Sequence, residues 1–437
     1  MSIHSFGPIN HAEIDVSRFL VLIGPQASGK STIAKLVYYF LHARDEVTAW
    51  IIEQDEPGQT KGRARELKKR LRKSFVEFFG PTPQQPEVRI TYSYGPNSNL
   101  EIALDKEHHK YITPNFSNSI WRQIVELIYE THGKLSRGPG PVFPSTVGKL
   151  ASEQERAALL KHVRSRCNDI FGIDKELFFI PAGRSLLSTL AEQIQSIRPH
   201  LLDYPMRQFV ETVNNTKVYF DRSLDDMVRE RQALSQAELD FPAIRKARRY
   251  VEKVLQGEYR YDREGGKLFV DSNTFTKISY ASSGQQEVLW ILLSLFLLVL
   301  DGSPTLVFIE EPEAHLFPQA QNDITKFVAF VFNEIGCDFL ITTHSPYMLS
   351  CINNLLYARD LGMRGQGPAV GNIVAEDLWL SPVDVSGYFV VNGSVDPILV
   401  PDIPALKSEL VDSASEAISD EFEKLLSLER EAVRHAE

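Results

Sequence analysis

The sequence predicts an α/β fold with a parallel sheet, and three apolar runs support this prediction. The first, at residues 19–23, precedes a glycine-rich turn and a helical pattern. The other two, at 305–309 and 337–343, have the β-branched and apolar composition of strands buried on both faces. Helical patterns lie between these runs, and alternating strands and helices are typical of an α/β unit.

The turn after the first strand reads G-P-Q-A-S-G-K-S-T, a complete phosphate-binding loop. Its two glycines let the backbone curl so that N–H groups point at a phosphate, and the next helix presents its positive end to the same anion. Lys30 can then reach the β- and γ-phosphates, and the Ser31 hydroxyl can hold Mg²⁺. The sequence therefore predicts that the chain binds a nucleoside triphosphate. The predicted nucleotide-binding residues of this loop are Gly24, Gln26, Ala27, Ser28, Gly29, Lys30, Ser31 and Thr32.

Bulk composition indicates a globular protein. The chain has 437 residues, 43% of them hydrophobic, which is enough for about two or three domains. A net charge of −10 argues against a chain whose main role is to coat nucleic acid or an anionic membrane. Cys167, Cys337 and Cys351 include no C-x-x-C pair, so neither a disulfide framework nor a thiolate zinc site is indicated.

These features lead us to expect a cytoplasmic protein with no membrane partner. The N-terminus lacks a signal-peptide pattern. The longest apolar run, at 288–300, is shorter than the roughly 20 residues that a bilayer span requires, so it is expected to form a buried helix.

The middle of the chain contains further helices and hairpins. A basic amphipathic segment at 61–73 has Leu67, Leu71 and Phe75 on one face, and its charges either contact nucleic acid or an acidic partner or form a solvated face. No heptad pattern is sustained, so a long coiled coil is not predicted. The other predicted elements are hairpins at 88–105 and 259–270, a strand at 178–180, and helices at 117–135, 146–171 and 186–255.

Carboxylates follow the strand at 305–309, which ends in E-E-P-E. Ligands of open α/β sheets bind at the carboxyl ends of the strands. We expect Glu310 to hold Mg²⁺ through its water shell and Glu311 to accept a proton from the attacking water.

Two further segments add polar groups to the predicted site. Ser282, Ser283, Gly284 and Gln285 stand directly before the buried helix, so their backbone N–H groups form a second anion site at a helix N-terminus. The strand at 337–343 ends at His344, where the imidazole can hydrogen-bond a γ-phosphate.

Taken in order, G-P-Q-A-S-G-K-S-T, A-S-S-G-Q-Q, L-V-F-I-E-E-P-E-A-H-L and T-T-H-S resemble the ABC-type ATPase heads of the OLD and RecF-like group, relatives of the SMC heads. The resemblance covers residues 1–45 and 275–350. It identifies 24–32 as Walker A, 282–285 as the signature motif, Glu310 and Glu311 as the Walker B pair, 314–317 as the D-loop and His344 as the switch histidine. It thus implies catalytic roles for Lys30, Glu311 and His344.

This resemblance implies the fold of a P-loop NTPase, an ABC-type ATPase head with an inserted helical lobe and antiparallel β-hairpins. Its cofactors are ATP and Mg²⁺, and its functional form is a homodimer or a higher homo-oligomer. The signature residues of one copy cap the γ-phosphate held by the other, which agrees with one Walker A motif beside two anion sites. The implied domains are ATPase lobe I at 1–115, a helical lobe at 116–257, ATPase lobe II at 258–400 and an acidic C-terminal helix at 401–437.

Three positions depart from the pattern of the family. Glu310 replaces the usual Walker B aspartate, and Phe317 stands where transporter heads end the D-loop in aspartate. The Q-loop glutamine has no single assignment: Gln54 is one candidate for it, and the P-A-G-R-S turn with Arg184 is the alternative that would serve the same space.

The resemblance also suggests what the ATPase controls. OLD nucleases carry a C-terminal Toprim domain, and too few residues follow His344 for one. A separate effector, a nuclease or toxin, is therefore expected, as in phage-defence systems of the PARIS type. The acidic C-terminal helix offers a surface for it or packs on its own domain.

Other classes remain open. A DNA repair or recombination ATPase of the RecF/SMC-like type would bind the DNA backbone through residues 61–73 and 245–249. A transporter subunit is disfavoured by the large insert, and a purely structural protein would not need Glu311 and His344. The pair His108 and His109 lacks a third spaced ligand, so it is interpreted as a surface feature and not a metal site.

Overall fold

The computed structural model describes residues 1–53, 60–81, 87–104, 112–131, 146–185, 202–234, 240–271, 273–400, 403–407 and 419–426. In these residues a six-stranded sheet has the order β14-β13-β3-β12-β11-β7. Its strands from β13 to β7 are parallel and β14 is antiparallel at one edge, so the predicted α/β fold is confirmed. The bounds are β3 Phe19–Ile23, β7 Glu176–Ile180, β11 Thr305–Glu310, β12 Asp338–Thr343, β13 Val385–Val391 and β14 Ser394–Pro397.

Both faces of this sheet are covered. Along β3, Phe19, Val21 and Ile23 point into one hydrophobic core. The alternate residues Leu20 and Leu22 belong to a second core on the other face. Because a strand buried on both faces needs apolar residues at every position, its sequence is a continuous apolar run.

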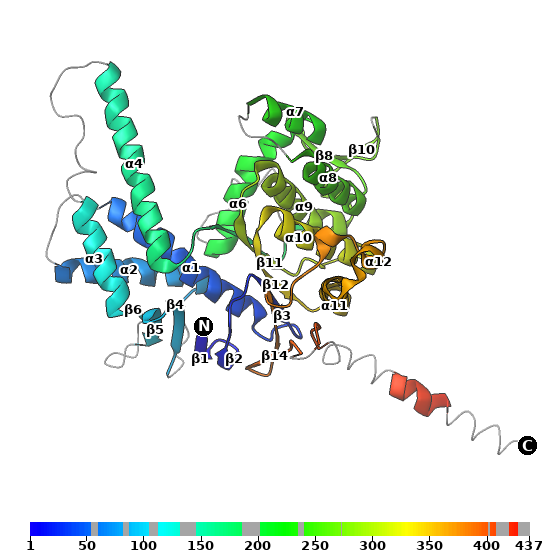
Figure 1. The fold of residues 1–437 in the computed structure, drawn as a ribbon, viewed down its shortest axis with the longest axis horizontal. Coiled ribbons are helices and arrows are strands. Elements are labelled where there is room, and N and C mark those ends of the chain that lie inside the picture. The colour runs from blue at the N-terminus through cyan, green and yellow to red at the C-terminus, as the bar shows by residue number, and fades with distance from the viewer. Residues whose placement is uncertain are drawn as a thin grey trace, which may run out of the picture.

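Helices close each core. The first core contains side chains from α6 (Tyr204–Thr216), α8 (Phe241–Leu255), α9 (Ser283–Asp301), α10 (Pro318–Ile335) and α11 (Pro346–Leu361). The second contains side chains from α1 (Lys30–Ile52), α2 (Thr60–Phe79), α3 (Asn118–Thr131) and α4 (Thr146–Phe171). In Figure 1, α4 projects beside α3 on one side of the molecule, while α7 and α8 lie on the other.

Antiparallel sheets complete the architecture. One has the order β2-β1-β4-β5-β6 and contributes to the second core, and a smaller one has the order β10-β9-β8. The predicted hairpins at 88–105 and 259–270 are confirmed as β4–β5 and β8–β9. The bounds are β1 Ser2–Phe6, β2 Ile9–Glu13, β4 Arg89–Gly95, β5 Ser98–Leu104, β6 Ile112–Phe116, β8 Glu258–Asp262, β9 Gly265–Phe269 and β10 Phe275–Lys277.

The remaining helices agree with the sequence pattern where it can be compared. The predicted helices at 117–135 and 146–171 are confirmed as α3 and α4, while 186–201 of the third lie outside the described residues. In the basic helix α2, Leu67, Leu71 and Phe75 are all buried, as their spacing predicts. The other elements are α7 Leu224–Leu234, α12 Gly367–Gly371, the 3₁₀ turns η3 Lys217–Asp221, η4 Ile278–Tyr280 and η6 Glu376–Leu378, and the π turn η5 Gly362–Gln366.

Helix α9 contains the longest apolar run of the sequence. It begins at Ser283, five residues before that run, and has 19 residues. By length and composition it could cross a membrane, and no other helix among the described residues meets that test. Most of it is buried inside the protein. The prediction of a buried helix is therefore confirmed, although the helix is longer than the run suggested.

Phe308 of β11 lies at the centre of the second core. Its ring stacks on Phe179 at a centroid distance of 5.6 Å and meets Tyr38 at 5.2 Å. We expect Phe308→Ala to lower the free energy of unfolding by about 3–5 kcal/mol, because the rings around it cannot fill the cavity. Urea unfolding measures this loss. The matched control is Val383→Ala, since Val383 is 89% exposed, and its effect should stay within about 0.5 kcal/mol.

Candidate functional site

Four loops meet at one edge of the central sheet because their strands are parallel neighbours. Strand β3 ends opposite β12, with Ile23 paired to Thr343. Glu310 of β11 is paired to Thr342 of β12, and β7 ends beside β11. The phosphate-binding loop, His344, the Glu310–Glu311 pair and the P-A-G-R-S turn therefore leave the sheet at the same edge.

The phosphate-binding loop depends on its two glycines. Gly29 has a φ of +107°, a conformation that L side chains rarely adopt. At Gly24 a Cβ atom would lie only 2.2 Å from the carbonyl oxygen of Val390 in β13. Within the loop the Ser28 hydroxyl is buried without a hydrogen-bond partner among the described residues, so this polar group is available to a ligand of the loop. Gln26, Ala27 and Ser31 are exposed, and Thr32 is half-buried.

Lys30 opens helix α1 and folds back over the loop. Its ammonium group donates to the carbonyl oxygens of Gly24 at 2.9 Å and Pro25 at 2.8 Å. Burial lowers the pKa of Lys30, and the nearby Glu311 and Glu313 carboxylates oppose that change. A lysine ammonium has three donors, so one remains for a ligand oxygen.

Glu310 has the free oxygen that a cation requires. Its side chain is buried, and Oε2 accepts a hydrogen bond from the backbone N–H of Ala182 at 3.1 Å. Oε1 is buried with no hydrogen-bond partner in the described part of the chain. An unpaired buried carboxylate oxygen fits Mg²⁺, which is commonly bound through one or two carboxylates together with water and phosphate oxygens. Among the described residues, no group of three or more His, Cys, Asp or Glu side chains could hold a metal ion on its own. A site of the kind described for Mg²⁺ does not need such a group, because water and phosphate oxygens supply the remaining ligands.

Glu311 and His344 lie close together on adjacent loops. Glu311 has a positive φ of +43° and is held by a hydrogen bond from its N–H to the carbonyl oxygen of Thr342 at 2.8 Å. Its Oε1 lies 3.9 Å from Nδ1 of His344, too far for a direct hydrogen bond. The same Nδ1 atom lies 3.2 Å from Oε1 of Glu313, a residue for which the sequence suggested no role. Both Glu311 and His344 stay partly exposed, so both can meet a ligand at this edge.

Arg184 joins the P-A-G-R-S turn to the start of α9. Its side chain is wholly buried, and it donates to the carbonyl oxygens of Pro181, Glu287, Glu310 and Glu311 at 2.6–2.9 Å. Burial lowers its pKa, and the surrounding carboxylates, Glu287 first among them, oppose that change. Because these donors are engaged inside the protein, Arg184 positions the predicted Walker B turn. The other Q-loop candidate, Gln54, lies outside the described residues.

The signature segment forms an ordered and exposed helix end. Ser282 caps α9, and its capping box with Gln285 is complete, since the hydroxyl accepts from the Gln285 N–H while the Gln285 side chain accepts from the Ser282 N–H. Gln285 also donates to the carbonyl oxygen of Leu255 at 2.9 Å, so its side chain is engaged within the chain. Ser283 is exposed and Gly284 is buried, and no hydrogen bond from the N–H of Ser283 is found among the described residues. The first turn of α9 can therefore meet an anion at Ser283.

The D-loop packs on this helix end. A Cβ atom at Gly284 would lie 2.7 Å from the carbonyl oxygen of His315, which has a positive φ of +58°. Phe317 caps α10 without any side-chain hydrogen bond, and 78% of its surface is exposed. Positive φ values at non-glycine residues are uncommon, and here two of them, at Glu311 and His315, lie beside the predicted catalytic groups.

Two hairpins form walls that the sequence did not predict. A Cβ at Gly29 would meet Ile9 at 2.6 Å and Pro8 at 2.9 Å, so the turn between β1 and β2 contacts the phosphate-binding loop. That turn is tied to the turn between β13 and β14 by a hydrogen bond from the Asn10 N–H to the Gly393 carbonyl oxygen at 2.9 Å. Strand β1 buries only Ile3 and Phe6, and β2 buries only Ile9 and Ala12, so their apolar signal is short and easily missed.

Other predicted features lie apart from this edge. In the segment 61–73, Lys68, Arg70 and Arg72 donate to groups elsewhere in the chain, whereas Arg65 and Lys69 are exposed.

All three cysteines are buried, and burial raises the pKa of the Cys337 thiol to about 11 and of the Cys351 thiol to about 12, so both stay protonated near neutral pH. The pair His108 and His109 lies outside the described residues.

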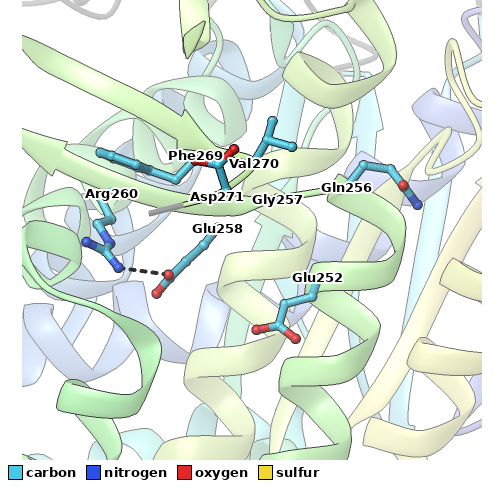
Figure 2. A pocket seen from close by; sticks show the side chains of 8 residues that line it. All are labelled: Glu252, Gln256, Gly257, Glu258, Arg260, Phe269, Val270 and Asp271. Carbon is cyan, nitrogen blue, oxygen red and sulfur yellow. Dashed lines mark hydrogen bonds and ion pairs between the residues drawn. The ribbon is translucent and has the colours of Figure 1, made fainter. Parts of the chain in front are cut away.

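A separate cavity of about 600 Å³ lies between the end of α8 and the β8–β9 hairpin (Figure 2). Within it the Arg260 guanidinium donates to Glu258 at 3.0 Å and lies 5.0 Å from the centroid of the Phe269 ring. None of the predicted site residues lines this cavity. It is lined by Glu252, Gln256, Gly257, Glu258, Arg260, Phe269, Val270 and Asp271.

The contacts of Arg184 predict a large effect on folding. We expect Arg184→Met to lower the free energy of unfolding by about 3–5 kcal/mol, because the Glu287 carboxylate loses its buried positive partner. Arg184→Met combined with Glu287→Met should cost less than the two single changes added together, since no unpaired charge then remains. Urea unfolding of the four proteins tests this, and strictly additive losses would contradict it.

Comparison with known proteins identifies the family of the chain. Residues 1–349 match the AAA_15 family, described as an AAA ATPase domain. No curated protein matches the chain. Two solved structures are similar to it. One is an SMC head bound to the C-winged helix domain of ScpA, with 11% sequence identity and a TM-score of 0.41, and the match covers 91% of this chain and 95% of that chain. The other is the SMC head domain from Thermotoga maritima, with 12% sequence identity and a TM-score of 0.34, and the match covers 91% of this chain and 97% of that chain. Since the family match spans most of its length, the chain belongs to the AAA_15 family of ATPases and is an ATP hydrolase.

Proposed function

We propose that this ATPase is a conformational switch in which ATP and Mg²⁺ are held between the heads of two copies. The observation that carries the proposal is the end of α9, where Ser282 and Ser283 are exposed in a chain with one Walker A motif. No hydrogen bond or ion pair joins these residues to the phosphate-binding loop within the described part of one chain. A second copy supplies the phosphate that they would cap.

Each residue of the edge has a task in this scheme. Lys30 and the N–H groups of the phosphate-binding loop bind the β- and γ-phosphates. Ser31 and Glu310 hold Mg²⁺, which neutralises charge on the phosphates when it is bound. Glu311 accepts the proton of the attacking water, and His344 donates to the γ-phosphate. Hydrolysis removes the group that both copies share, so it loosens the interface.

The controlled component is a separate effector protein, a nuclease or toxin, in a cytoplasmic phage-defence system. This part rests on the resemblance to OLD-like heads. The C-terminal helix supports it with an unpartnered apolar face, because Phe422 and Leu425 are 61% and 63% exposed among the described residues 419–426. The alternative of a DNA repair ATPase is less well supported, since several basic side chains of α2 contact other parts of the same chain.

The substitution Glu311→Gln tests the switch. The amide cannot accept the proton of the attacking water, so ATP turnover should fall by roughly 10²–10⁴-fold while nucleotide binding persists. We expect this variant to form a dimer with ATP and Mg²⁺, measured by light scattering. Lys30→Ala is the control and should stay monomeric. A Glu311→Gln protein that binds ATP and remains a monomer would reject the paired heads.

Phe317 gives a second test, in which folding and pairing change in opposite directions. Aspartate is a better N-cap than phenylalanine, so Phe317→Asp should raise the free energy of unfolding by about 0.5–1 kcal/mol. It should weaken the dimer of the Glu311→Gln protein at least about tenfold, because an exposed aromatic ring two residues after His315, which contacts Gly284, is lost from the interface. Unchanged pairing would show that Phe317 lies outside the contact.

A further inference from the structure

Glu313 is the third carboxylate after β11 and has an unusual set of donors. It is 3% exposed, and its Oε1 accepts from the Thr343 hydroxyl at 2.6 Å and from the His344 backbone N–H at 2.7 Å. The Nδ1 atom of His344 lies 3.2 Å from the same oxygen. One carboxylate oxygen thus binds both the backbone and the ring of a single histidine.

This arrangement fixes the ring in two ways. The hydrogen bond from the backbone N–H fixes the position of the His344 main chain. The contact to Nδ1 fixes the rotation of the imidazole ring. A carboxylate 3.2 Å from Nδ1 favours a proton on that nitrogen, which leaves Nε2 as the ring nitrogen that can meet a ligand. Glu311, whose Oε1 lies 3.9 Å from Nδ1, is too distant to do the same.

The other groups around the ring leave Glu313 as its orienting partner. Thr343 is wholly buried, and besides donating to Glu313 it accepts the Ser345 N–H at 3.0 Å. Ser345 caps α11 through the N–H groups of Tyr347 and Met348. The backbone on both sides of His344 is therefore held, and the carboxylate of Glu313 decides where its ring points.

We propose that Glu313 is a positioning residue for ATP hydrolysis, which holds the His344 ring so that Nε2 faces the γ-phosphate. The proposal rests on the role given to His344 in the proposed function. It adds that the third acid of E-E-P-E acts on His344 through its Oε1 atom, while its Oε2 atom is buried with no hydrogen-bond partner among the described residues.

A double-mutant cycle on turnover separates this role from a merely structural one. We expect Glu313→Ala to lower kcat by about 10–100-fold with little change in KM. In a His344→Ala background the same change should lower kcat by less than about twofold, because there is no ring left to orient. Glu313→Gln retains an acceptor oxygen and should restore kcat to within about threefold of the native protein. An equal loss from Glu313→Ala in both backgrounds would overturn the proposal.

Thr343→Val is the control variant, since it removes the hydroxyl that donates to Glu313 and accepts the Ser345 N–H but leaves the His344 ring contact in place. Its kcat should stay within about threefold of the native value, even where the protein unfolds at a lower temperature. A loss as large as that of Glu313→Ala would show that the carboxylate serves only to tie the two loops together.

A measurement on the native protein avoids the case in which the alanine variant does not fold. Nitrogen NMR of ¹⁵N-histidine-labelled protein, assigned by comparison with His344→Gln, reports which ring nitrogen carries a proton. We expect a proton on Nδ1 of His344. A bare Nδ1 would overturn the proposal. This result does not depend on pairing of the heads, so failure of the Glu311→Gln dimer and failure of the Glu313 role are distinguishable.

Discussion

The parallel register of four neighbouring strands is the constraint on which the site depends. With Ile23 opposite Thr343 and Glu310 opposite Thr342, the strand ends lie level, and the loops that follow share one edge. A shift of one residue along any strand would exchange the side chains of its two faces. Since both faces of β3 are buried in separate cores, packing forbids that shift. The geometry of the polar edge is therefore set by apolar contacts beneath it.

A second layer of order comes from buried charge. Arg184 gathers backbone carbonyls from the turn after β7, from the end of β11 and from the first turn of α9. Buried ion pairs are weak contributors to stability compared with apolar packing, but removing one member is costly. Such an arrangement favours one relative position of these segments. It links the residues expected near Mg²⁺ to the helix end expected to face a second copy.

Much of this could be predicted from short sequence motifs. The loop at 24–32, the strand before Glu310 and the buried helix α9 carry strong local patterns, and each lies where its pattern implies. The contacts of Glu313 and Arg184 could not be predicted, because a single carboxylate or guanidinium in a loop has no pattern that names its partner. The hairpin walls beside Gly29 were also missed, since Pro8, Ile9 and Gly393 come from opposite ends of the chain. Whether the predicted residues bind ATP and Mg²⁺ in these roles stays a prediction.

The close approach of Gly284 to His315 has a mechanical consequence. With no side chain at one position and only 2.7 Å between a hypothetical Cβ and the opposing oxygen, the two backbones touch and leave no room for sliding. A movement of the turn after β11 toward α9 would therefore press directly on the first turn of that helix, and a movement of α9 would press on the turn.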